Sequence, residues 1–152
     1  MAVLSWGKCT IEKVTSQDGT PQLSWTPLDT PKQDSTQLIP KAGNETTATE
    51  EGGDIVDVRF DKTTYEFVFD IFVKKKKERP FNDVDGVVAG EFAFRLTPED
   101  EECDGIQIDR AKVRVEESYK SAEGIMLHHV CKCLKPASGN TVKPYKKSPE
   151  AA

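Results

Sequence analysis

The residues best suited to metal or nucleophile chemistry are a histidine and two cysteines near the C-terminus. His129, Cys131 and Cys133 alternate along an apolar segment, so on a β-strand they would share one face. Imidazole and thiolate are common zinc ligands, but alternate residues of a strand lie about 6.5–7 Å apart, too far to converge on one tetrahedral ion. The C-x-C spacing also lacks the second cysteine pair of a zinc knuckle. We interpret the three as core residues and predict no metal, cofactor or catalytic site.

Motifs of nucleophilic catalysis and phosphate binding are missing elsewhere. The sequence has no G-x-S-x-G, P-loop or G-x-G-x-x-G motif, and Gly52-Gly53 lacks the basic residue of a phosphate loop. The carboxylates lie in polar runs, without the apolar surroundings that would raise a pKa for acid–base work. We expect that the protein is not an enzyme. The alternative, an enzyme using His129 and Cys131, would hold a metal or a thiol of unusual reactivity.

Two oppositely charged blocks could act on a partner. The basic block consists of Lys74, Lys75, Lys76, Lys77 and Arg79, and the acidic block consists of Glu99, Asp100, Glu101, Glu102 and Asp104. Charge runs are often solvated loop tips, and that interpretation stays open. The second hypothesis is that the blocks meet across a boundary between two copies, because such head-to-tail contacts generate rings or tubes. Nucleic-acid binding by the basic block is a third, weakened by the absence of an aromatic platform nearby.

Length and composition limit the classes of protein further. The 152 residues are 36% hydrophobic and 31% charged, with a net charge of −5, which argues against tight binding of duplex nucleic acid. The length fits a single domain over residues 1–152. The four cysteines show no disulfide framework, so we expect free thiols. We expect no signal peptide and no membrane segment, and hence synthesis in the cytoplasm.

The elements that must hold these residues are mostly β-strands. From residue 65 to 73 every odd position is apolar, and aromatic and β-branched residues are frequent, which indicates a strand. We predict that it forms a hairpin with residues 56–60 across the short connection Asp61-Lys62. Further strands are predicted at residues 3–14, 88–96, 106–118 and 125–134, with a short one at 141–145.

The predicted strand at 106–118 changes phase in its middle. Its apolar residues are even-numbered up to Ile108 and odd-numbered from Ala111 onward. One face can hold both sets only if the strand carries an extra residue, so we predict a β-bulge at Asp109 and Arg110. We expect the strand to bend there between two sheets.

Two segments fall outside the strand pattern. Residues 97–102 (TPEDEE) predict one short helix, because a threonine N-cap, a proline and acids in the first turn follow one another. Residues 15–51 are long and polar, and we predict a projecting arm that becomes ordered on a partner. The large apolar residues spaced along the arm are Trp25, Leu28, Leu38 and Ile39. We expect residues 146–152 to form a flexible tail.

A series of short phrases resembles the tail tube proteins of phages, in particular those of prophages in gut bacteria. None of the phrases is a catalytic signature, and the likeness depends on their number and order over residues 28–145. They lie at residues 28–31 (LDTP), 34–38 (DSTQL), 50–53 (EEGG), 56–58 (VDV), 65–67 (YEF), 86–92 (GVVAGEF), 95–100 (RLTPED), 108–110 (IDR) and 134–137 (LKPA).

The resemblance implies a mainly β fold in which two packed sheets form a barrel-like sandwich with one short helix and a long projecting arm. It implies a structural subunit of a phage or prophage tail, whose hexameric rings stack into a tube through which DNA passes. The partners would be copies of the chain and other tail proteins such as the tape measure, sheath or tube terminator. The location would be the virion tail. Tube proteins of type VI secretion and other contractile injection systems share this architecture and are the alternative.

We assign the subunit contacts to the two charged blocks and the four large residues of the arm. Alternation alone nominates lumen-facing residues, and an acidic lumen would repel DNA phosphates so that the duplex slides. These candidates are Glu66, Asp70, Lys112, Arg114 and Glu116. A monomeric ligand-binding β-barrel module is the remaining hypothesis, and it predicts a compact arm and no large assembly.

Overall fold

The computed structural model describes residues 4–146 and consists of β-strands joined by loops. Val3, where the predicted N-terminal strand began, and residues 147–152 of the predicted tail lie outside the described residues. Eleven strands form one curled sheet shaped like a half-barrel, in the order β2-β1-β10-β11-β12-β7-β4, with the other four attached at its sides. Two more strands, β5 and β6, form a small second sheet.

The strands of the large sheet differ widely in length. The long ones are β1 (Thr10–Gln17), β7 (Thr64–Phe72), β10 (Phe92–Thr97), β11 (Gly105–Lys120) and β12 (Gly124–Cys133). The short ones are β2 (Thr20–Pro21), β3 (Thr26–Pro27), β4 (Gln37–Lys41), β8 (Asp83–Val84), β9 (Val87–Val88) and β13 (Val142–Tyr145). The small sheet consists of β5 (Glu45–Thr49) and β6 (Ile55–Phe60).

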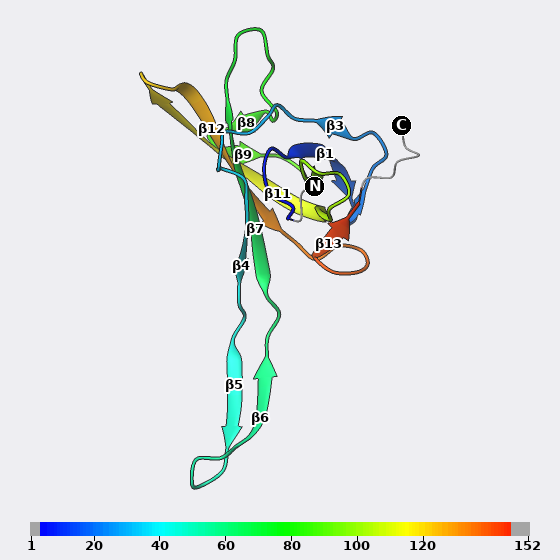
Figure 1. Cartoon of the computed structure of the whole chain (residues 1–152), viewed down its shortest axis with the longest axis vertical. Helices are drawn as coiled ribbons and strands as arrows, with labels where there is room; N and C mark the ends of the chain where they lie inside the picture. Colours follow the sequence, from blue (N-terminus) through cyan, green and yellow to red (C-terminus); the bar gives the residue numbers. More distant parts are fainter. Residues whose placement is uncertain (1–3, 147–152) are drawn as a thin grey trace.

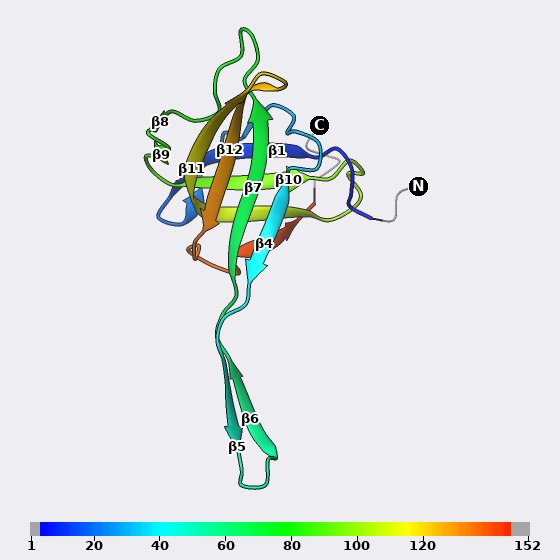
Figure 2. The ribbon, with the colours of Figure 1, turned by 90° about the vertical axis from the view of Figure 1, so that its left-hand side faces the viewer.

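The curled sheet packs one half against the other. Strands β4, β7 and β12 run along the length of the molecule, and β1 and β10 cross behind them (Figure 2). Strand β11 belongs to both halves, because residues 105–108 pair with β10 and β13 whereas residues 111–120 pair with β12. Orthogonal layers are commonly joined by a strand of this kind.

The predicted β-bulge in β11 is confirmed. Phe94 pairs with Ile108 and Phe92 pairs with Ala111, so β11 advances three residues while β10 advances two. The extra residue falls at positions 109–110, where Ser16 donates a hydrogen bond of 2.7 Å to the backbone carbonyl of Asp109. The bulge lets Ile108 and Ala111 both face the core.

The core fills the space between the two halves. Phe67 and Phe69 of β7 and Phe94 of β10 are almost completely buried, and their ring centroids lie 5.4–6.3 Å apart. Burial of one such ring contributes on the order of 1.5–3 kcal/mol. The apolar odd-numbered face predicted for residues 65–73 is therefore the inner face of β7.

The short helix predicted for residues 97–102 is wrong. Thr97 ends β10, and residues 98–104 form a loop with a turn in which the amide of Cys103 donates to the carbonyl of Asp100. Glu99, Glu101 and Glu102 are exposed, so a helix here would have no apolar face to bury. The favourable cap residues do not offset the cost of nucleating one or two turns.

The predicted hairpin between residues 56–60 and 65–73 is also wrong. Strand β6 pairs with β5, and β7 pairs with β4 and β12, so β6 and β7 follow each other in one direction. The chain reverses at residues 50–54 instead, where Gly52 and Gly53 adopt φ values of +97° and +96° that favour glycine. The backbone amide of Asp61 donates a hydrogen bond of 2.8 Å to the backbone carbonyl of Asn44, between the segments that join the hairpin to β4 and β7.

The projecting arm does not have the predicted bounds of residues 15–51, because it begins later and extends to Phe60. Residues 15–17 belong to β1, and β2 and β3 pair with β1. Leu28 and Leu38 pack against the core of their own chain, which holds residues 28–41 on the body. The projection is the β5–β6 hairpin, which extends far beyond the body (Figure 1).

Candidate assembly interface

The β5–β6 hairpin is almost entirely exposed. All five residues of β5 are exposed, and the apolar Ile55, Val56 and Phe60 of β6 have 64%, 56% and 74% of their surface accessible. A two-stranded hairpin is marginally stable in water unless its apolar side chains are covered. The apolar side chains of the hairpin therefore gain little stabilisation from the described chain itself.

The hairpin is also strongly acidic. Between residues 45 and 61 six carboxylates stand against the single cation Arg59. Three of them, Glu50, Glu51 and Asp54, surround the turn at the tip, and none forms an ion pair with another residue of the described chain. Sequence analysis missed this site, although EEGGD next to strand-forming residues is a turn signal.

The predicted basic block lies at the opposite end of the molecule. The loop between β7 and β8 carries Lys74–Lys77 and Arg79 and extends away from the hairpin in both views (Figures 1 and 2). Arg79 pairs with Glu117, and Lys77 lies 4.0 Å from Asp29. The other three lysines, residues 74–76, are exposed and form no ion pair within residues 4–146.

The predicted acidic block lies on the flank of the body, in the β10–β11 loop beside the N-terminal segment (Figure 2). Glu99 accepts a hydrogen bond of 2.8 Å from the amide of Lys8, and Asp100 accepts one of 3.0 Å from the amide of Glu102. These hydrogen bonds occupy part of the block within its own chain. Because the block lies on the flank, it is not at the end of the molecule opposite the basic loop (Figure 2).

The four large residues assigned to the arm have different surroundings. The centroid of the Trp25 ring lies 4.4 Å from the guanidinium carbon of Arg95. The Nε of Arg95 also donates a hydrogen bond of 2.9 Å to the carboxylate of Glu12. Leu28 and Leu38 pack against the core. Ile39 alone of the four is exposed, with 44% of its surface accessible.

The outward face of β11, β12 and β7 carries a ladder of paired charges. The strand register aligns Lys112 with Lys132 and Glu66, and Glu116 with His128 and Asp70. With Arg114, all five residues nominated for the lumen thus share one face. Lys132 lies 3.4 Å from Glu66, His128 lies 2.5 Å from Asp70, and Arg114 lies 3.8 Å from Glu116. Within these rows three carboxylates oppose three cations, so the ladder is balanced rather than acidic.

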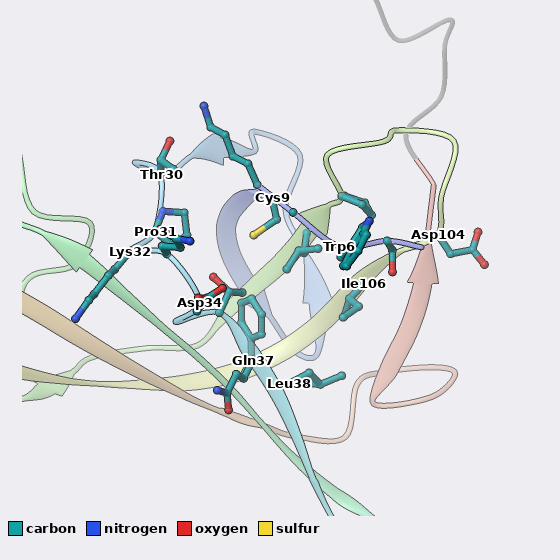
Figure 3. A pocket seen from close by; sticks show the side chains of 18 residues that line it. Trp6, Cys9, Thr30, Pro31, Lys32, Asp34, Gln37, Leu38, Asp104 and Ile106 are labelled. Carbon is teal, nitrogen blue, oxygen red and sulfur yellow. The ribbon is translucent and has the colours of Figure 1, made fainter. Parts of the chain in front are cut away.

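A free strand edge and a pocket lie at the border of the curled sheet. Strand β4 ends the sheet order, so one of its backbone edges pairs with no strand of the described chain. Beside it lies a pocket of about 670 Å³, lined by Trp6 and Cys9 of the N-terminal segment, Leu38 of β4 and Ile106 of β11 (Figure 3). An extended segment of another molecule could add a strand at such an edge.

The histidine and cysteines of the predicted core are buried as expected. His129, Cys131 and Cys133 lie on the inner face of β12, and each has at most 7% of its surface accessible. Burial lowers the pKa of His129 to about 4, raises the pKa of Cys133 to about 12, and raises the pKa of Cys131 well above its ordinary value. The thiols are therefore protonated at neutral pH. Among residues 4–146 no group of three or more His, Cys, Asp or Glu is arranged to hold a metal ion.

The sequence matches no protein-family model and no curated protein. Within the described part of the chain, no helix is long and apolar enough to cross a membrane.

Proposed function

We propose that the chain is a structural subunit of a phage or prophage tail tube. In this proposal hexameric rings of the chain stack into a tube, DNA passes through the lumen, and the assembled protein resides in the virion tail. The tape measure, sheath or tube terminator would be its other partners. The inner tube of a type VI or another contractile injection system is the alternative, which the same surfaces would serve.

The observation that carries the proposal is the β5–β6 hairpin. Within the described chain it pairs with no strand of the curled sheet, and it exposes Ile55, Val56 and Phe60. Exposed apolar side chains on an unsupported hairpin favour association.

Lateral association has its own candidate surface. The unpaired edge of β4 and the adjacent pocket lie at the border of the half-barrel, so the sheet of one subunit can continue into the next. Joining edges in a closed ring removes the exposed backbone groups that otherwise promote aggregation. We propose that β4, β7, β12 and the second half of β11 then face the lumen.

The charge ladder supports passage of DNA along this face. Glu66, Asp70 and Glu116 are matched by Lys112, Arg114 and Lys132 on the same face. Such alternating charges leave a weak field at a distance, and therefore neither attract phosphates strongly nor hold them. Sequence analysis expected an acidic lumen that repels DNA. The proposal now is that the ladder binds DNA weakly because its charges are balanced.

Removal of the hairpin tests the proposal. The backbones of Asn44 and Asp61 are already hydrogen-bonded at the base of the hairpin. An Asn-Gly turn can therefore replace residues 45–60. We expect the full chain to form rings or tubes in sedimentation velocity and negative-stain electron microscopy, with tubes shortened by high salt. The shortened chain should unfold at the same temperature and form no tubes. A full chain that remains monomeric at every concentration and salt would refute the proposal.

A second candidate function, a ligand-binding β module, is favoured by one observation: the pocket of about 670 Å³ beside β4. Its size falls in the range of small-molecule sites. This hypothesis predicts that the protein is a monomer, that a hydrophobic dye or ligand binds, and that Trp6→Ala abolishes this binding. Binding that disappears on assembly would show instead that a neighbouring subunit fills the pocket.

A further inference from the structure

Two surfaces of opposite charge lie at opposite ends of the long axis. The acidic tip consists of Glu50, Glu51 and Asp54 at the turn of the β5–β6 hairpin, and the basic tip consists of Lys74, Lys75 and Lys76 in the β7–β8 loop. The two views show one tip at each extreme of the molecule, with the body between them (Figures 1 and 2). The two surfaces therefore cannot meet within one chain.

Each tip lacks a partner of opposite charge within its own subunit. No ion pair within residues 4–146 involves any of these six residues. The lysines are held close together by a turn in which the amide of Lys77 donates to the carbonyl of Lys74 at 3.2 Å. Like charges concentrated on a turn repel one another, and an incoming set of carboxylates would relieve that repulsion.

Exposed apolar residues lie next to the acidic tip, and others follow the basic loop on the side of the body, where Val87 pairs with Arg114 of β11. Behind the acidic tip lie Ile55 and Val56, with 64% and 56% of their surface accessible. The loop with the basic tip leads directly into β8 and β9, where Val84 and Val87 are 78% and 68% accessible. The apolar side chains beside the acidic tip suit a contact whose centre is apolar and whose rim is charged.

We infer that the acidic tip of one subunit docks on the basic tip of the next subunit along the long axis. The inference rests on the proposed function and names its axial contact. The carboxylates of Glu50, Glu51 and Asp54 bind the ammonium groups of Lys74, Lys75 and Lys76. This pairing replaces the one that sequence reasoning suggested, in which the basic block would meet the block at residues 99–104. Because the acceptor and donor surfaces differ, the contact repeats without closing and produces a stack.

Charge reversal at each tip tests the contact. The acid-reversed variant is Glu50→Lys/Glu51→Lys, and the base-reversed variant is Lys74→Glu/Lys75→Glu. Each should form rings but no tubes, because its two tips carry the same sign. A chain with all four substitutions should form tubes again. An equimolar mixture of the two reversed variants should also form tubes, because each variant's tip then meets the opposite charge on the other.

The matched control is Glu102→Lys/Asp104→Lys, which changes the net charge as much as the acid-reversed variant does. It should form tubes like the unaltered chain. Tubes formed by either reversed variant alone would overturn the axial contact. A failure of both the mixture and the fourfold variant to form tubes would also overturn it. If rings still formed in these cases, the proposed function would stand. Loss of tubes only in the control variant would restore the pairing with the acidic block. Absence of rings and tubes from the unaltered chain would refute both proposals.

Discussion

The imidazole ring of His129 stacks on the ring of Phe69, with centroids 4.6 Å apart and an interplanar angle of 16°. Both rings are completely buried, and neither nitrogen of His129 has a hydrogen-bond partner within the described chain. The histidine is therefore held as a neutral, aromatic core residue. Burial lowers its pKa from 6.5 to about 4, because a charge in this position would lose its hydration.

This pKa shift predicts acid lability. Between pH 6.5 and 4 the unfolded chain takes up a proton at His129 that the folded chain refuses, so the free energy of unfolding falls as the pH falls. Above pH 6.5 His129 is neutral in both states, so the free energy of unfolding has its full value there. The loss should reach about 2 kcal/mol at pH 5 and about 3 kcal/mol below pH 4. Urea unfolding at pH 7.5, 6, 5 and 4 measures it.

The control variants for this experiment are His129→Leu and His128→Gln. His129→Leu should flatten the pH dependence and leave stability at pH 7.5 unchanged or higher, because it removes two unsatisfied polar atoms. His128→Gln alters the neighbouring histidine, which lies on the outward face, and should retain the slope between pH 6.5 and 4. An equal slope in His129→Leu and the unaltered chain would contradict the assignment.

Gly105 should tolerate no side chain. A Cβ at this position would lie 2.0 Å from the backbone carbonyl oxygen of Leu96, at the point where β10 pairs with β11. Backbone has to shift to relieve such a contact, so Gly105→Ala should lower the free energy of unfolding by about 2–4 kcal/mol. Gly124→Ala is the comparison: its Cβ would have no neighbour within 4 Å, and its φ of +77° should cost only about 1 kcal/mol. Equal losses in the two variants would show that the close approach at Gly105 is relieved elsewhere.

The cysteines should fall into two classes toward a thiol reagent. Cys131 and Cys133 are buried and their pKa values are raised by burial, whereas Cys9 and Cys103 are partly exposed. Under native conditions a disulfide reagent such as Ellman's should modify Cys9 and Cys103 first, and Cys131 and Cys133 only on unfolding. Mass spectrometry after limited labelling identifies the modified residues. Fast labelling of Cys131 in the folded protein would instead support an enzyme that uses this region.

Sequence reasoning succeeded where a local pattern has a single geometric solution. The change of phase between Ile108 and Ala111 requires an extra residue in β11, and the two-residue period defines the inner face of β7. It failed where pairing depends on distant segments. Asp61-Lys62 resembles a short connection, but the reversal belongs to Gly52 and Gly53, and only the positions of β4 and β12 show that β7 has other partners. The acidic tip and the basic tip could be recognised as complementary only after the fold placed them at opposite ends.

The balanced outward face of the sheet gives the last prediction. Glu66 is partly exposed there and Glu116 is exposed, and reversing both would change the three carboxylates and three cations of the ladder into one carboxylate and five cations. If this face lines the lumen, tubes of Glu66→Lys/Glu116→Lys should bind a short DNA duplex that tubes of the unaltered chain do not retain. Binding should weaken steeply between about 50 and 200 mM salt, because phosphate contacts release counterions. Fluorescence anisotropy of a labelled duplex measures both effects. Tubes of Glu102→Lys/Asp104→Lys gain the same charge on the flank of the body and should bind much less, and equal binding by the two variants would mean that the ladder face does not surround the DNA.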